Sequence, residues 1–211
     1  MTGYTGKADV RTNQRQSCRE RLLRTASDLF YRHGCHTTGI DRILAESGVA
    51  KMTLYKHFQS KEELVLAVAE RFQENAREAL EAHLAGCDES PRDRLLGLFD
   101  VLAEWCARPG YYGCMSVNLA VQFPSPDHPI HLAVAEHKRC REGVIRSLAE
   151  EAGAANPAAL AGELLTVMEG ATVLCQVTGQ TAYVDHARDA ARAVIDRHLP
   201  RGGADLGPGV A

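Results

Sequence analysis

Residues 51–57, KMTLYKH, concentrate side chains that can bind an anionic partner. Two lysines and a histidine can carry positive charge, and threonine and tyrosine hydroxyls can bond phosphate oxygens or base edges. On a helical wheel of about 100° per residue, Leu54 and Phe58 share one side. The other residues fall on the opposite side or its flanks: Lys51, Met52, Thr53, Tyr55, Lys56 and His57. The segment therefore predicts a short helix with a buried side and an exposed cationic, hydrogen-bonding side.

A second short helix is predicted immediately before this one. Thr38 and Asp41 form a T-x-x-D start signature, an apolar stripe that includes Ile43 follows, and Gly48 ends the helix. Two short helices joined by a tight glycine turn, the second with a polar exposed face, form a helix-turn-helix whose second helix fits the major groove of DNA. Lys61, at the start of the next predicted helix, suits a phosphate.

The charge distribution helps to choose between a DNA-binding face and an ordinary solvated helix, because either could carry two lysines and a histidine. The whole chain has a net charge of −3. Residues 1–66 hold 11 Lys/Arg against 7 Asp/Glu, whereas residues 67–211 hold 13 against 20. A basic N-terminal third on an acidic body favours contact with a polyanion at that end.

The fold class is predicted to be all-α with about nine helices, since apolar residues recur at helical spacing and no strand pattern is found. We expect a disordered arm over 1–14, a helix-turn-helix domain over 15–62 with its motif at about 39–58, a larger helical domain over 63–200 and a disordered tail over 201–211. A hydrophobic fraction of 45% and a charged fraction of 24% are typical of globular proteins.

Several classes of protein are disfavoured by the sequence. The seven cysteines are scattered, without C-x-x-C pairs, so we expect reduced thiols and a cytoplasmic protein rather than a disulfide framework. We find no secretion signal and no stretch of about 18 apolar residues free of charge, so we predict no membrane partner. No catalytic motif is present, so we predict neither an enzyme nor a cofactor. His128, His131, His137 and Cys140 leave a metal site as a weaker alternative.

Three stretches of the N-terminal region resemble the DNA-binding domain of the TetR/AcrR family of regulators. They are "ASDLFYRHG" at 26–34, "TTGIDRILAESGV" at 37–49 and "LYKHFQSKEEL" at 54–64. The order and length of the match are specific, and it covers about a quarter of the chain. The remainder is similar to the family only in its helical layout.

The resemblance implies a homodimer that binds a palindromic operator in double-stranded DNA, with a larger C-terminal domain for an inducer and for dimerisation. We accordingly expect a ligand-responsive transcriptional regulator, a repressor released by a small molecule. The predicted DNA contacts are Thr38, Lys51, Thr53, Tyr55, Lys56, His57 and Lys61. The family often has Gly, Ser or Pro where this chain has Ala50 and Met52, so the bases that are read stay open.

The body of the chain suggests a pocket and a dimer surface. Residues that mix aromatic surface with a few polar groups are candidate ligand contacts, although each could also be plain core: Trp105, Tyr111, Cys114, Asn118, Phe123, Met168, Cys175 and Gln176. The last two predicted helices are rich in alanine and glycine, for example at Gly162, Gly170, Ala187 and Ala191. Small faces allow close helix packing, within one chain or between two; with the family resemblance, they predict a homodimer through these helices.

Cys114 supports an alternative mechanism. It follows Gly113 at a predicted helix start, where free amides and the helix dipole favour a reactive thiolate. The stretch also resembles the "GC…N" segment of a TetR-type subgroup, some of whose members sense electrophiles or oxidants. The alternative is therefore a thiol-based sensor on the same scaffold, although free cysteines are often buried. A ligand-binding helical protein without operator activity is a third possibility.

Overall fold

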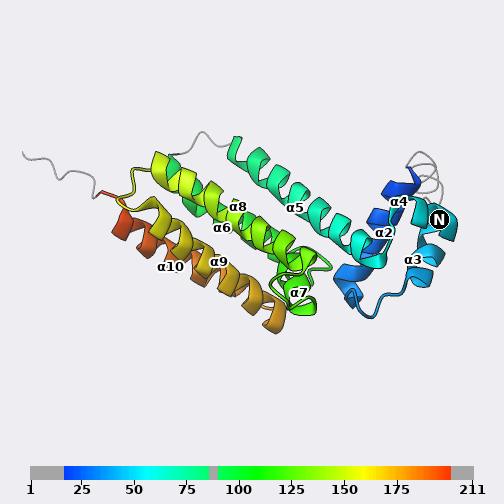
Figure 1. Ribbon diagram of the computed structural model, residues 1–211. Helices are drawn as coiled ribbons and strands as arrows, with labels where there is room; N and C mark the ends of the chain where they lie inside the picture. Colours follow the sequence, from blue (N-terminus) through cyan, green and yellow to red (C-terminus); the bar gives the residue numbers. More distant parts are fainter. Residues whose placement is uncertain (1–16, 86–89, 201–211) are drawn as a thin grey trace, which may run out of the picture. The chain divides into compact units, whose positions relative to one another are not determined.

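The computed structural model describes residues 17–85 and 90–200, which form nine α-helices and no strand (Figure 1). The helices are α2 (Cys18–His33), α3 (Ile40–Ser47), α4 (Lys51–His57), α5 (Lys61–Ala85), α6 (Pro91–Cys106), α7 (Met115–Gln122), α8 (Pro129–Glu151), α9 (Pro157–Thr178) and α10 (Ala182–His198). The predicted all-α fold is confirmed. The expected arm over 1–14, the tail over 201–211 and Cys87 lie outside the described residues.

Local capping interactions define the helix ends at several places. The Ser17 side chain accepts a hydrogen bond from the Glu20 amide at the start of α2, and α2 ends at Gly34 with φ of 81°. Before α5, Ser60 Oγ accepts from the Glu63 amide at 3.1 Å, and Glu63 Oε2 accepts from the Gln59 amide at 2.6 Å. Each of these contacts joins residues within four positions of each other, so the local sequence determines these helix boundaries.

The predicted start of α3 was wrong in its cap. Gly39 occupies the N-cap position, and no side chain caps this helix. Thr38 is instead fully buried, and its hydroxyl donates to the Gly34 carbonyl at 2.8 Å. The threonine therefore closes the loop between α2 and α3, a role that the T-x-x-D pattern does not distinguish from a cap.

The chain divides into two compact units. Among the described residues, unit 1 comprises 17–74 and 115–134, and unit 2 comprises 75–85, 90–114 and 135–200. Each has its own hydrophobic core among the described residues. The sequence analysis expected two domains, each continuous in sequence, with the boundary at residue 62. Unit 1 is discontinuous, because it also includes α7 and the first residues of α8.

Unit 1 is centred on α2, α3, α4 and the first half of α5. Its core includes Leu22, Ile43, Leu54 and Leu64, each with no exposed surface. Glu20 on α2 also pairs with Arg71 on α5 at 2.6 Å, and this hydrogen-bonded guanidinium holds the pKa of Glu20 below its ordinary value of 4.5. The helices that carry the predicted DNA contacts thus pack around a common apolar core.

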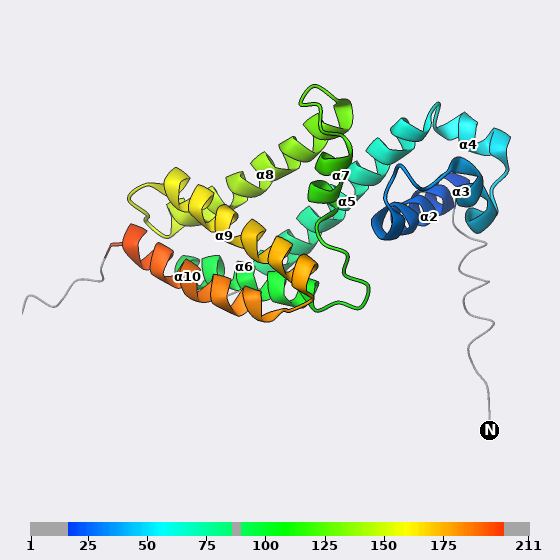
Figure 2. The same ribbon diagram turned by 90° about the horizontal axis from the view of Figure 1, so that it is seen from below.

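Unit 2 is built from α6, α9 and α10, together with most of α8 and the end of α5. Helix α10 packs against α9 and α6, and α9 and α10 lie side by side in both views (Figures 1 and 2). Ala161 on α9 and Ala191 on α10 have no exposed surface. Part of the alanine-rich character of these helices therefore serves packing within the chain.

Helix α9 is long and apolar enough, by length and composition, to cross a membrane, with 39% of its most apolar window buried. Every 18-residue window of α9 contains Glu163 and Glu169, so this finding does not contradict the expectation that no charge-free apolar stretch of that length exists. Core helices of soluble proteins pass the same test, and one side of α9, including Leu160, Leu164 and Met168, lies in the core of unit 2.

Candidate nucleic-acid interface

Helix α4 exposes the polar face that its sequence predicts. Leu54 is fully buried and Phe58, directly after the helix, is nearly so, and these two anchor α4 to the core. Lys51, Met52, Tyr55 and Lys56 are exposed, and Thr53 and His57 are half-buried. Four of these residues line a shallow hollow on the outside of the helix: Met52, Thr53, Tyr55 and Lys56. This arrangement can present hydrogen-bonding, cationic and apolar groups to the major groove together.

The turn between α3 and α4 is held by a residue that sequence reasoning missed. Gly48 has φ of 63° and ψ of 26°, the left-handed conformation that favours glycine. The Arg21 guanidinium donates to the carbonyls of Ser47 at 3.2 Å and of Gly48 at 3.0 Å. Arg21 therefore closes the carboxyl end of α3, where a cation is favoured. No local signal reveals this contact, because Arg21 lies 26 residues before Ser47.

The remaining predicted contacts differ in exposure. Lys61 is half-buried at the first position of α5. Burial raises the pKa of the neighbouring Cys35 thiol to about 11, and the Lys61 charge opposes this shift. The Thr38 side chain has no exposed surface, so it cannot reach DNA in this conformation; it positions the loop instead.

Helix α7 is joined to the loop after α2 by Gln122. Gln122 Oε1 accepts hydrogen bonds from the backbone amide of Cys35 at 2.6 Å and from that of His36 at 3.4 Å. His36 Nε2 also bonds the Gln122 carbonyl at 2.8 Å. A Cβ on Gly34, whose φ is already positive, would lie 3.1 Å from Gln122 Oε1. These contacts tie α7 to the helix-turn-helix, and the sequence alone does not indicate a partner for Gln122.

Phe123 and the turn histidines pack within unit 1. The Phe123 ring lies 5.2 Å from the His36 ring and 4.8 Å from the His128 ring, and His131 Nδ1 bonds the Phe123 carbonyl at 2.8 Å. Among residues 17–85 and 90–200, no three His, Cys, Asp or Glu side chains are grouped to hold a metal ion. The histidines of this turn, considered above as metal ligands, thus have structural contacts here.

The predicted ligand contacts divide between the two units. Asn118 and Phe123 belong to unit 1, and the other six belong to unit 2. In unit 2, Trp105 and Tyr111 meet edge to face at 5.1 Å, and the Tyr111 hydroxyl donates to the Thr172 carbonyl at 3.0 Å. Met168 and Cys175 are buried. A Cβ added at Gly113 would lie 1.9 Å from Gln176 Oε1. Only glycine at position 113 therefore leaves room for the Gln176 side chain.

Cys114 lies beside an ion pair in unit 2. The residue is only 5% exposed, so burial opposes the reactivity expected from its position before a helix. Lys138 Nζ lies 3.6 Å from Cys114 Sγ and 2.5 Å from Glu169 Oε1. Next to this pair, burial lowers the pKa of His137 to about 4, and the charges of Arg141 and Lys138 add to that shift.

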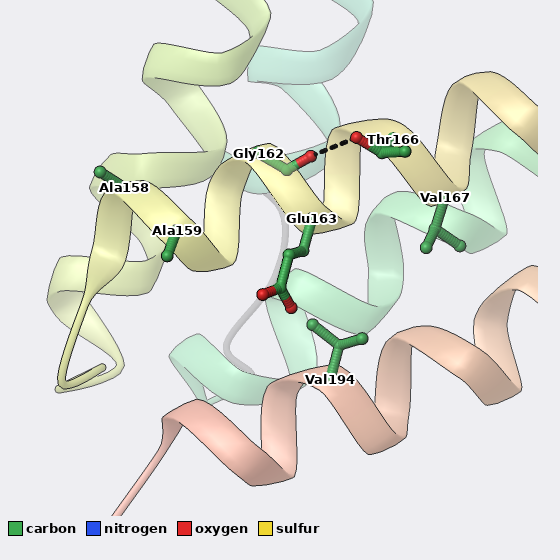
Figure 3. A pocket seen from close by; sticks show the side chains of 7 residues that line it. All are labelled: Ala158, Ala159, Gly162, Glu163, Thr166, Val167 and Val194. Atoms are coloured by element: carbon green, nitrogen blue, oxygen red, sulfur yellow. Dashed lines mark hydrogen bonds between the residues drawn. The ribbon is translucent and has the colours of Figure 1, made fainter.

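A second groove lies along α9 and α10 and is lined mainly by small or apolar residues. Figure 3 shows its lining: Ala158, Ala159, Gly162, Glu163, Thr166, Val167 and Val194. Beyond it, α9 exposes Val173, Leu174 and Val177, the last at 76%. Gly170 lies four residues after Thr166 and seven before Val177, so an accessible stripe runs along one face of α9.

Sequence models of protein families match both parts of the chain. Residues 22–68 match the model described as "Bacterial regulatory proteins, tetR family". Residues 91–191 match the model described as "Tetracyclin repressor-like, C-terminal domain". The first match covers α3, α4 and their turn, and the second covers most of unit 2 together with α7 and the start of α8.

Individual proteins agree with these matches. The chain is 46% identical over 61 residues to the HTH-type transcriptional activator FasR of Mycolicibacterium smegmatis, covering 29% of this chain and 28% of FasR. It is 30% identical over 105 residues to the HTH-type transcriptional repressor NemR of Escherichia coli, covering 49% of this chain and 53% of NemR. The chain thus spans about a quarter to a half of these curated relatives.

A solved structure extends the likeness over nearly the whole fold. The crystal structure of a TetR-family transcriptional regulator from Streptomyces coelicolor superposes with a TM-score of 0.81 at 26% identity, covering 86% of this chain and 95% of that one. With the exposed α4 face, its glycine turn and both family models in agreement, the chain belongs to the TetR family of helix-turn-helix transcriptional regulators.

Proposed function

We propose that this protein is a homodimeric repressor that binds a palindromic operator through α3 and α4 and leaves it when a small molecule binds unit 2. The observation that carries the DNA-binding part is the α4 face, where Lys51, Tyr55 and Lys56 are exposed beside a turn held by Gly48. Relatives include both an activator and a repressor by name. We further propose that this protein acts as a repressor, in the cytoplasm and without enzymatic activity.

The DNA contacts fall into two groups by their place. Tyr55, Lys51 and Lys61 lie at the flank of α4 and at the start of α5, where phosphates are the natural partners. Thr53, Lys56 and His57 lie on α4 itself and are assigned to base edges or to neighbouring phosphates. Thr38 is assigned a positioning role because its hydroxyl is buried.

The test is binding to duplexes from the DNA beside its own gene, measured by fluorescence anisotropy at salt concentrations from about 50 to about 200 mM. Wild-type protein should bind one duplex tightly, with affinity that falls as salt rises. Lys61→Ala should weaken binding to all duplexes alike and flatten the logarithmic salt slope by about one unit. Arg108→Ala is the control, because Arg108 is an exposed cation in unit 2. An unchanged slope in Lys61→Ala would refute the phosphate role.

The dimer is supported by the accessible side of α9 and α10. The exposed stripe and groove of small residues would be covered by the same surface of a second copy, as a twofold interface requires. Of the alanines noted in the sequence, Ala187 and Ala191 are buried within the chain. Accordingly, the proposed interface uses α9 from Ala158 to Val177 and the outer side of α10, near Val194.

Release by a ligand is assigned to the unit 2 residues among the predicted contacts. Trp105, Tyr111 and Met168 supply aromatic and apolar surface, and Cys114 and Gln176 supply polar groups. A ligand that binds better to the form with wrongly spaced recognition helices shifts the dimer off DNA. Titration of the protein–DNA complex with candidate compounds, scored by loss of anisotropy, tests this step.

A thiol-based sensor is the second candidate, and the Lys138–Cys114 contact of 3.6 Å favours it. The contact places a cation beside the sulfur, whereas the burial of Cys114 slows attack by reagents. Brief alkylation of the native protein followed by mass spectrometry ranks the cysteines against exposed Cys18 and buried Cys175. If Cys114 reacts as slowly as Cys175, or if Cys114→Ser still leaves DNA on oxidation, this candidate is wrong.

A further inference from the structure

Met52 is the most exposed large apolar side chain in the described part of the protein. Its exposed fraction is 83%, compared with 76% for Val177 and 73% for Val121. Isolated exposed apolar residues are common and need no explanation by themselves. The position of Met52 is what matters, because it is the second residue of α4, on the face assigned to DNA.

The surroundings of Met52 are polar and cationic. Lys51 precedes it, and it shares a shallow hollow with Thr53, Tyr55 and Lys56. Helix α4 is anchored on its other side by Leu54, so Met52 contributes nothing to the core. A partner that fits this hollow needs negative charge around a small apolar group.

The major groove of DNA offers that combination. Phosphates border the groove, and the 5-methyl group of thymine is the apolar group that bases present there. Residues at the N-terminal end of a recognition helix are the ones that contact base edges. A methionine thioether is flexible and polarisable, so it can adapt to a methyl group without exact shape complementarity.

We propose that Met52 reads the 5-methyl group of one thymine in each operator half-site. The inference rests on the proposed DNA binding and adds the chemical group that is recognised. Removing one buried methyl should weaken binding about fourfold in one half-site and about fifteenfold when both half-sites are changed. The discrimination is between thymine and uracil, which differ by that methyl alone.

The experiment replaces each thymine of the operator by deoxyuridine, symmetrically in both half-sites, and measures Kd by anisotropy. For wild-type protein, the full loss of affinity should occur at a single thymine position of the half-site. Met52→Ala should bind the natural operator about as weakly as wild type binds the uracil version, and should lose its discrimination at that position only. Val121→Ala, a similarly exposed apolar change away from α4, is the matched control and should behave as wild type.

A second arm isolates the methyl in a different base. With the critical T·A pair changed to C·G, 5-methylcytosine in place of cytosine should restore affinity for wild type and not for Met52→Ala. The inference is overturned if wild-type protein binds every uracil operator as tightly as the natural operator. It is also overturned if Met52→Ala discriminates thymine from uracil as strongly as wild type does. The uracil arm uses wild-type protein, so it holds even if the variant folds poorly. Absence of salt-dependent binding to any duplex would instead overturn the proposed function, and this inference with it.

Discussion

At the scale of single residues, His137 makes the stability of unit 2 depend on pH. Its pKa in the folded protein is about 4, below the ordinary value of 6.5, mainly because of burial and then because of Arg141 and Lys138; Glu169 opposes the shift. Between these values the unfolded chain binds a proton that the folded chain does not. The stabilising difference is therefore complete above pH 6.5 and is lost as the pH falls towards 4.

We expect the free energy of unfolding of wild type, relative to His137→Gln, to fall by at most about 1 kcal/mol per pH unit between pH 6.5 and 4. Urea unfolding of both proteins at several pH values measures this difference. His137→Gln is the control, because all other titrating groups are the same in the two proteins. A pH-independent difference between the two proteins would show that His137 is solvated and titrates normally.

At the scale of elements, one side chain of α7 accepts the hydrogen bonds from the backbone amides of the loop after α2. Gln122 accepts the amide hydrogen bond of Cys35, which is 1% exposed, so Gln122→Ala leaves a buried donor without a partner. Such a loss costs about 1–3 kcal/mol. Melting temperature should therefore fall by roughly 2–4 °C for each kcal/mol lost, and DNA affinity should fall with it because the α2–α3 loop is loosened.

Two further variants define this attachment. Gln122→Glu keeps the acceptor for the Cys35 amide but loses the donor to the Asn118 carbonyl, which is 3.0 Å away, so an intermediate loss is expected. Val121→Ala alters the exposed neighbouring residue and should change neither quantity. If Gln122→Ala melts and binds DNA like wild type, the contact does not hold the element in place.

At the scale of the whole molecule, the proposed dimer predicts that a substitution on its interface can prevent dimerisation without affecting the folding of each chain. A Cβ added at Gly170 would meet no atom within 4 Å beyond its own stretch of helix, so an arginine side chain there begins in open space. Gly170→Arg should fold normally, because replacing glycine inside a helix is favourable, and yet should block a second copy. We expect a monomer by sedimentation velocity and loss of tight binding to a full palindrome.

Gly143 on α8 provides the matched control, since a Cβ at this position would also have no neighbouring atom within 4 Å. Gly143→Arg should sediment and bind DNA as wild type does. A dimeric Gly170→Arg protein that retains operator affinity would place the interface elsewhere.

The sequence by itself determined the helical fold, the end of α3 at Gly48 and the exposed side of α4. These features depend on interactions within a few residues, such as caps, glycine conformation and apolar spacing, and these can be recognised in a short window.

Only the tertiary structure decided the roles of residues whose partners are distant in sequence. It buried Thr38 and Cys114, placed Arg21 on the α3–α4 turn and Gln122 on the α2–α3 loop, and added residues 115–134 to unit 1. The same hydroxyl, thiol or amide serves as a surface contact or a buried brace according to what packs over it. Helical periodicity predicts which side of a helix is apolar, but it carries no information about which distant segment covers that side.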